Sequence, residues 1–297
     1  MDRARRRQSL RTGLPRWAGQ GLKTVLPFKP FLAPEHEPFH FEGGQPAALL
    51  VHGFPGTPLE MRATGETLHE LGFTAKGILL PGFGSEIESL PKKTAQDWLE
   101  AVLSALKELR QNHSPLLLVG NSMGSALSLA AAVQVKIDGL IVYAPFWKIP
   151  GPLWASLPVV RRVLPQVKPM RIMKPDFNSS QFRQGLADFL PGIDIDDPAI
   201  REQIVDFNVP IGLFDEIRKA GQMGYQAIPH QAAPTLILQG RADNLVDLKF
   251  TRANLRRYPV QVTYAEFDGG HDLYDPSRPA WGKVKEQVTL FAKQIQK

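Results

Sequence analysis

The sequence predicts a fold of the α/β class, with a mostly parallel central sheet flanked by helices and an inserted cap. Short apolar segments of strand length alternate with longer segments of helical period along most of the 297 residues. A proline-rich interval, 146–230, interrupts this alternation. We therefore expect an α/β core formed by residues 35–145 and 231–297, a cap at 146–230, and a basic N-terminal arm at 1–34.

The net charge of +6 comes from the N-terminal arm. Residues 1–34 hold eight Arg or Lys against one acid, Asp2, whereas the remainder carries 27 basic and 28 acidic side chains. The body of the protein therefore has no basic field for nucleic acid. Two interpretations of the arm stay open: a solvated segment, or one that lies peripherally on an anionic membrane. In the membrane-bound interpretation, the contact would be made by the apolar side chains of Trp17, Leu22, Val25, Leu26 and Phe28.

The composition limits the chemistry that the chain can perform. Hydrophobic residues make up 43% of it, enough for a sizeable core, and there is no cysteine. The absence of cysteine excludes disulfides and thiolate chemistry and fits a reducing compartment, so we expect a cytoplasmic location. No apolar run has the length of a membrane span. With no metal-ligand spacing and no phosphate-binding loop, we expect no cofactor and no metal.

The first half of the chain gives clear start and stop signals. An edge strand at 39–42 and a strand at 47–51 are followed by a helix, which we expect to begin with Thr57 as N-cap and to end at Gly72. The next strand is expected at 73–80. An amphipathic helix then runs from Thr94, its N-cap, to residue 112.

Further strands and helices complete the expected core. Buried strands are predicted at 116–119 and 139–144, with a helix over 125–133 between them. After the cap we expect a strand at 234–239, a helix from Asp247 to Tyr258, a strand at 260–267 and a last helix from Pro279 to Gln296.

The apolar strand at 116–119 leads directly into Gly120-Asn121-Ser122-Met123-Gly124, and a helical segment follows at once. In this strand–turn–helix context, Gly-x-Ser-x-Gly presents its serine as a nucleophile. The tight turn requires glycine at positions 120 and 124, where a Cβ would collide with neighbouring elements. Ser122 lies at a helix N-terminus, where N–H groups favour negative charge.

Two partners for Ser122 follow in chain order. Asp243 comes three residues after the glycine that closes the strand at 234–239, and His271 comes just after the strand at 260–267. Because catalytic groups gather at the carboxyl edge of an open α/β sheet, Ser122, His271 and Asp243 are predicted to form a catalytic triad. Other acids stand near in sequence, namely Asp247, Asp268 and Asp272, and Asp247 also suits a helix N-cap.

Five segments together carry a resemblance to a known family. They read His52-Gly53-Phe54-Pro55-Gly56-Thr57-Pro58, Leu80-Pro81-Gly82-Phe83-Gly84, Gly120-Asn121-Ser122-Met123-Gly124, Gly240-Arg241-Ala242-Asp243 and Gly270-His271. The chain resembles the α/β-hydrolase superfamily, and within it the capped bacterial carboxylesterases and monoacylglycerol lipases. The resemblance implies the α/β-hydrolase fold. The sequence differs from the lipases at Phe83, where they usually carry histidine, and at Ser125, where a third glycine is common.

Ester cleavage also requires donors for the developing oxyanion. The backbone N–H of Met123, directly after the nucleophile, is one expected donor. The other is the N–H of Phe54, because Pro55 has none. We expect His52 to brace this loop by hydrogen bonding rather than to transfer protons.

The cap begins with bulky apolar side chains that are candidates for an acyl-binding wall. The residues singled out are Phe146, Trp147, Ile149, Leu153 and Trp154. The alternative for each is that it only packs the cap onto the core.

The triad predicts a serine hydrolase that acts through an acyl-enzyme. The resemblance implies a carboxylesterase or lipase of the EC 3.1.1 class, acting on short- to medium-chain acyl esters or monoacylglycerols. The same fold and triad also serve C–C bond hydrolases, thioesterases and perhydrolases, which remain alternatives. A ligand-binding receptor with the same fold is a third hypothesis, although none of the three triad residues has been lost from this chain.

Overall fold

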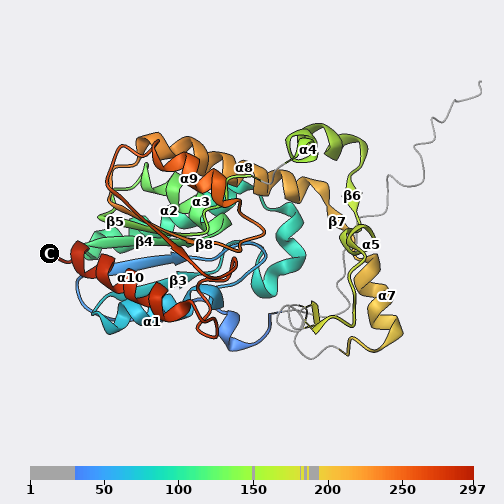
Figure 1. The fold of residues 1–297 in the computed structure, drawn as a ribbon, viewed down its shortest axis with the longest axis horizontal. Coiled ribbons are helices and arrows are strands. Elements are labelled where there is room, and N and C mark those ends of the chain that lie inside the picture. The colour runs from blue at the N-terminus through green and yellow to red at the C-terminus, as the bar shows by residue number, and fades with distance from the viewer. Residues whose placement is uncertain (1–30, 149–150, 181, 184–185, 187–193) are drawn as a thin grey trace, which may run out of the picture.

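The computed structural model describes residues 31–148, 151–180, 182–183, 186 and 194–297 (Figure 1). Residues 1–30 of the predicted arm and Ile149 of the predicted acyl wall lie outside the described residues, and the side chain of Leu153 is likewise not described.

A seven-stranded sheet forms the centre of the molecule, with the strand order β1-β3-β2-β4-β5-β8-β9. Only the edge strand β1 is antiparallel to its neighbour; the other pairs are parallel. The strands are β1 (Phe39–Phe41), β2 (Ala47–Val51), β3 (Thr74–Ile78), β4 (Leu116–Asn121), β5 (Gly139–Tyr143), β8 (Thr235–Gly240) and β9 (Val262–Phe267). The mostly parallel sheet predicted from the apolar segments is confirmed.

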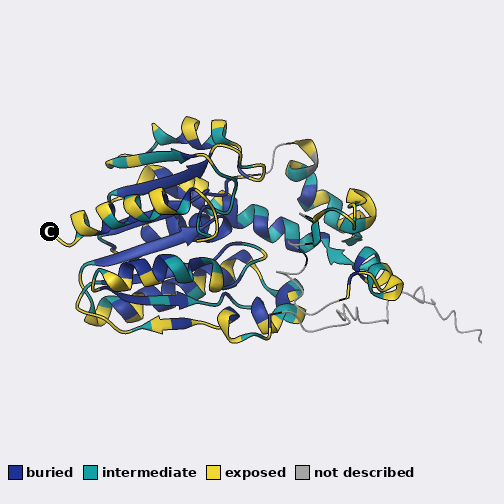
Figure 2. Ribbon diagram, turned by 60° about the horizontal axis from the view of Figure 1, so that its bottom comes forward, coloured by how far each residue is buried: buried dark blue, intermediate teal, exposed yellow. Residues whose placement is uncertain are grey.

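The central strands are buried on both faces. Every residue of β2, β4, β5 and β8 is buried, as Figure 2 shows by the dark strands between partly exposed helices. Continuous runs of Val, Ile and Leu are typical of parallel strands with helices on both sides. One side carries α1 (Leu59–Glu70) and α10 (Trp281–Ile295); the other carries α2 (Ala95–Asn112), α3 (Met123–Ala132), α8 (Ile211–Ala227) and α9 (Leu248–Leu255).

Helix ends agree with the sequence signals at Thr94, Asp247 and Gly72. They differ at Thr57, at the end of α9, which stops at Leu255 instead of Tyr258, and at the start of α10, which begins at Trp281 instead of Pro279. Thr94 forms a capping box with Asp97, and Asp247 caps α9 by accepting from the N–H of Lys249 at 2.8 Å. Gly72 has φ of +87° after the end of α1, as its expected role as a helix stop requires. The Thr57 N-cap prediction is wrong: the helix starts after Pro58, and the Thr57 hydroxyl is 2.9 Å from Nδ1 of His36.

A long insertion leaves the carboxyl end of β5 and returns to β8. It contains α4 (Pro152–Val163), α5 (Pro169–Met173), α7 (Pro198–Asp206) and a two-stranded ribbon of β6 (Gln166–Val167) and β7 (Val209–Pro210). In Figure 1 these elements stand to one side of the sheet. Helix α8 leads back from β7 and packs Leu213, Ile217 and Ala220 into the main core. The limits 146 and 230 stay a prediction, because α8 belongs to both parts.

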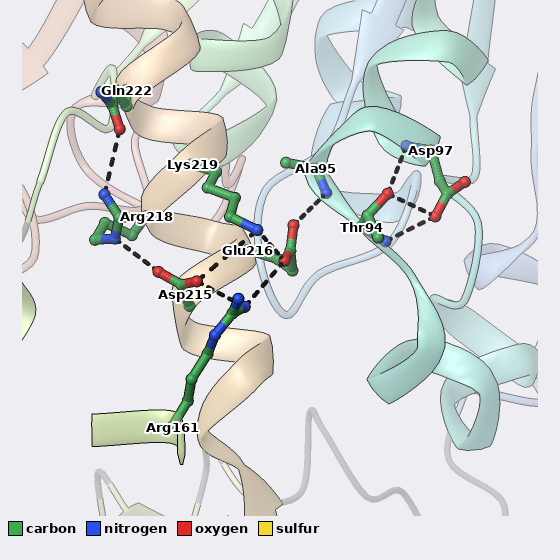
Figure 3. A network of polar contacts seen from close by, with 9 residues as sticks. All are labelled: Thr94, Ala95, Asp97, Arg161, Asp215, Glu216, Arg218, Lys219 and Gln222. Carbon is green, nitrogen blue, oxygen red and sulfur yellow. Dashed lines mark hydrogen bonds and ion pairs between the residues drawn. The ribbon is translucent and has the colours of Figure 1, made fainter. Parts of the chain in front are cut away.

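A charged network on α8 ties the insertion to the core (Figure 3). The Asp215 side chain is only 1% exposed; Oδ1 accepts from Arg218 at 2.8 Å, and Oδ2 lies 2.9 Å from Nη1 of Arg161 on α4. Glu216 accepts from the backbone N–H of Ala95, at the start of α2, at 3.1 Å. The two neighbouring acids thus connect α8 to the insertion on one side and to a core helix on the other.

In the part of the chain that the structure describes, none of the helices is both long enough and apolar enough to cross a bilayer.

Candidate active site

Ser122 occupies a strained turn between β4 and α3. Its φ of 52° and ψ of −114° are rarely adopted by an L-residue, and its N–H donates to the carbonyl of Tyr143 on β5 at 2.9 Å. The strain is therefore held by the strand ladder. The expected strand–turn–helix placement of the motif is observed, with Ser122 as the N-cap residue of α3.

The two glycines of the motif sit where backbone segments approach closely. A Cβ on Gly120 would lie 2.6 Å from the carbonyl oxygen of Gly124, and a Cβ on Gly124 would lie 2.3 Å from that of Val51. Both contacts are with backbone, which cannot move aside like a flexible side chain. The glycines thus let α3 start directly against the ends of β4 and β2.

The two expected oxyanion donors belong to two segments that meet at Ser122. Met123 is the first residue of α3, so its N–H has no acceptor within the helix. Phe54 lies in the loop after β2, and this loop packs on the nucleophile turn: a Cβ on Gly53 would be 3.1 Å from Cβ of Ser122. Phe54 holds its ring edge-on to Phe83, 6.0 Å between centroids.

Asp243 and His271 are joined by a hydrogen bond between Oδ2 and Nδ1 of 2.9 Å. The loops after β8 and β9, two adjacent parallel strands, carry these residues. Gln239 also donates to Oδ2, and the N–H groups of Leu245 and Val246 donate to Oδ1. Burial raises the pKa of Asp243, but the His271 contact and the two backbone donors outweigh it and leave the pKa below its ordinary value.

The other acids of this region have partners of their own. Asp268 pairs with Arg241 and Asp272 with Arg278, while Asp247 caps α9. Among the described residues, no hydrogen bond joins Ser122 to His271. Such bonds are often long in free enzymes and shorten once substrate is bound. The structure thus brings Asp243 and His271 into contact and sets Ser122 at the carboxyl end of a strand in the same sheet.

His52 is fully buried and hydrogen-bonded through both ring nitrogens. Nε2 accepts from the N–H of Leu80 at 3.0 Å, so the ring proton is on Nδ1, which donates to the carbonyl of Gly53 at 2.8 Å. Burial lowers the pKa of His52 to about 4. A neutral imidazole held in this way braces the loop after β2 against the loop after β3.

His52 should make stability depend on pH. The unfolded chain takes up a proton near pH 6.5 and the folded chain only near pH 4, so the free energy of unfolding falls across this window by about 3 kcal/mol. Urea unfolding of the wild type and of His52→Gln between pH 7.5 and 4.5 checks this. We expect the difference in free energy of unfolding between the two proteins to narrow as the pH falls. An equal difference at every pH would contradict a buried, neutral His52.

Two residues of the predicted acyl wall are packed deeply in the core. Phe146 and Trp147 are 7% and 4% exposed and belong to the main core cluster. Trp154 is partly buried and rests edge-on against Phe146, 5.8 Å between centroids. For Phe146 and Trp147, packing of the insertion onto the core accounts for most of the side-chain surface.

Sequence reasoning did not single out two residues that hold the site together. Gln239, on β8, donates to Asp243 and accepts from the Thr251 hydroxyl at 3.0 Å. Glu60, in the first turn of α1, accepts from the N–H of Gly53 and from the side chain of Asn121. The partners of Glu60 lie in the loop after β2 and at the end of β4, and no local sequence pattern predicts these contacts. A polar residue within an otherwise apolar strand was the available signal for Gln239.

The described residues contain no group of three or more His, Asp or Glu side chains with the spacing of a metal site.

Comparison with known proteins assigns the chain to a family. Residues 48–281 match the model of the alpha/beta hydrolase family. A thermostable monoacylglycerol lipase of Bacillus sp. (strain H-257) is 38% identical over 96 residues, which are 32% of this chain and 38% of the lipase. A carboxylesterase of Bacillus subtilis (strain 168) is 32% identical over 106 residues, 35% of this chain and 43% of the esterase. The matches thus span less than half the length of either relative.

Solved structures agree on the fold. A structure from a study of LipS and LipT, two metagenome-derived lipolytic enzymes, has a TM-score of 0.69 at 20% identity. The match covers 88% of this chain and 98% of the other. The monoacylglycerol lipase of Paleococcus ferrophilus has a TM-score of 0.62 at 20% identity, covering 87% and 98%. With the fold and the family match in agreement, the chain belongs to the alpha/beta hydrolase family.

Proposed function

We propose that the protein is a serine hydrolase that cleaves carboxylic esters through an acyl-enzyme on Ser122. The observation that carries the proposal is the hydrogen bond between Asp243 and His271. These two residues lie in the loops after β8 and β9, and Ser122 follows β4, a parallel strand of the same sheet. The strained backbone of Ser122 supports it, since nucleophiles on such turns are held in unusual conformations.

The proposed first half-reaction acylates the serine. Nε2 of His271 takes the hydroxyl proton of Ser122 as Oγ attacks the ester carbonyl, and the oxyanion is held by the N–H groups of Met123 and Phe54. The bond to the alkoxy group then breaks, and His271 gives its proton to the departing alcohol. Asp243 keeps the imidazole in the tautomer that leaves Nε2 free and stabilises the imidazolium.

The second half-reaction returns the free enzyme. A water gives its proton to His271 as its oxygen attacks the acyl carbon. The bond to Oγ of Ser122 breaks, Oγ regains a proton from His271, and the carboxylic acid leaves. No cofactor is required at any step of this proposal.

The proposed substrates are short- to medium-chain acyl esters, including monoacylglycerols. The local similarity to a monoacylglycerol lipase and a carboxylesterase supports this class. A kinetic panel of p-nitrophenyl esters from two to sixteen carbons, with monoacylglycerols, acyl thioesters and a β-diketone alongside, tests it. Preference for oxygen esters with a clear chain-length optimum is expected. Preference for the thioester or the diketone would favour the thioesterase or C–C hydrolase alternative.

Phe54 should contribute through its backbone rather than its ring. Phe54→Ala keeps the N–H that is expected to face the oxyanion and removes the ring, with its contact with Phe83 and its packing against the main core. We expect kcat/KM to fall by about tenfold or less, far below the loss for a triad residue. Steady-state kinetics beside Ser122→Ala measure this, and an equal loss in both variants would contradict the backbone role.

A further inference from the structure

Glu60 is an acid beside the candidate site that the proposed reaction does not use. It lies in the first turn of α1, and its Oε2 accepts two hydrogen bonds, from the N–H of Gly53 at 2.8 Å and from Nδ2 of Asn121 at 3.0 Å. A Cβ on Gly56 would overlap the carboxylate, so the loop after β2 wraps closely around it. One carboxylate oxygen thus joins the loop after β2 to the end of β4, through two residues that are 68 positions apart in the chain.

The two residues that Glu60 binds stand directly before the groups that would perform the chemistry. Gly53 precedes Phe54, the expected donor of the first loop. Asn121 precedes Ser122, and Met123 follows. Glu60 holds the N–H of Gly53, and Nδ1 of His52 donates to the carbonyl of Gly53, which shares one planar peptide unit with the N–H of Phe54. The Asn121 side chain links the same carboxylate to the end of β4, directly before the turn that carries Ser122.

We propose that Glu60 is a positioning residue that sets the distance between the Phe54 and Met123 N–H groups, and hence the geometry of the oxyanion hole. The inference rests on the proposed function. Its physical basis is preorganisation: donors stabilise an oxyanion only if they are already aimed at its position. A shared acceptor between the loop after β2 and the end of β4 holds these two segments at a fixed separation before substrate arrives.

The electrostatics of Glu60 agree with this role. Burial raises the pKa of Glu60, while the two hydrogen bonds and the nearby His271 counteract part of that rise. The Asn121 amide has only one workable orientation, because its oxygen would repel the carboxylate. The contact with Asn121 is therefore directional, and a side chain that cannot accept both bonds would no longer link the loop after β2 to the end of β4.

The reach of the side chain and its charge can be separated by substitution. Glu60→Gln can place its amide oxygen at the Oε2 position and keep both bonds without the charge. Glu60→Asp keeps the charge but is one methylene too short, and Glu60→Ala removes both bonds. Glu66→Ala is the matched control, because Glu66 is an exposed acid on the same helix.

The experiment measures kcat and KM for a p-nitrophenyl ester, Ki for an alkyl trifluoromethyl ketone, and the melting temperature. The ketone forms a hemiketal oxyanion with the serine and so reports on the hole directly. We expect Glu60→Ala to lower kcat by about 100-fold, to weaken the ketone by a similar factor and to change KM by less than about threefold. Glu60→Gln should stay within about fivefold of the wild type and above Glu60→Asp.

Several outcomes would overturn the inference. They are a folded Glu60→Ala with unchanged kcat, a loss of kcat without loss of ketone affinity, or Glu60→Asp more active than Glu60→Gln. If Glu60→Ala does not fold, the comparison of kcat and ketone affinity between Glu60→Gln and Glu60→Asp decides the question. Wild type and Ser122→Ala run in the same assay: an inactive wild type rejects the proposed function, whereas an active wild type with unaffected Glu60 variants rejects only the role of Glu60.

Discussion

Ser122→Ala is expected to abolish ester hydrolysis while leaving the fold intact. The methyl group of alanine cannot form the acyl-enzyme, and kcat for a p-nitrophenyl ester should fall by about 10⁴-fold or more. The hydroxyl makes no hydrogen bond to another described residue, so its loss removes no stabilising contact in this part of the chain. Steady-state assays measure the loss of ester hydrolysis, and circular dichroism checks that the fold is intact.

Ser125→Ala is the control for Ser122→Ala. Ser125 lies in the first turn of α3, and its single hydroxyl proton is shared between the carbonyl oxygens of Gly120 and Tyr143, which are 2.7 and 2.8 Å from Oγ. Its loss should lower the melting temperature and leave most of the activity. Activity above a few per cent of wild type in Ser122→Ala would reject Ser122 as the nucleophile.

Asp243→Asn should have the second largest effect, a fall in kcat of about 10⁴-fold. The N–H groups of Leu245 and Val246 both donate to Oδ1, so the oxygen of the new amide will take that position. Its NH2 group then faces Nδ1 of His271 and requires that nitrogen to accept. The ring proton moves to Nε2, which can no longer take the proton from Ser122.

The control for Asp243→Asn is Asp268→Asn. Asp268 lies in the loop with His271 but pairs with Arg241 at the surface, and its neutralisation should change kcat by less than about twofold. Steady-state kinetics on the two variants decide between the acids. Comparable losses, or a larger loss for Asp268→Asn, would contradict the assignment of Asp243.

Much of the core could be predicted from the sequence because its signals are local. The apolar runs at 47–51 and 116–119 are strands, because runs this short with no polar position suit a strand covered on both faces of its sheet. Thr94 and Asp247 mark helix starts because their side chains bond to N–H groups two or three residues on. Thr57 shows the limit of this reasoning: the same hydroxyl found a partner in His36, which is remote in sequence.

The remaining site residues depend on contacts between distant segments. Glu60 has the appearance of an ordinary acid in a first helical turn, where the helix dipole alone would favour it. Its contact with Asn121 follows only once β2 and β4 are known to be neighbours. The apolar residues after β5 are a similar case, because large apolar side chains suit both core packing and substrate contact. For Phe146 and Trp147, only the fold shows how much surface is buried.

The most direct test of the central claim is the mass of the protein after reaction with a fluorophosphonate ester. The phosphorus should bond to Oγ of Ser122 with loss of fluoride, giving one adduct per chain. We expect peptide mapping to place this adduct on the segment containing Ser122, and ester hydrolysis to decline in step with labelling. An adduct on another residue, or complete labelling with hydrolysis retained, would contradict the account.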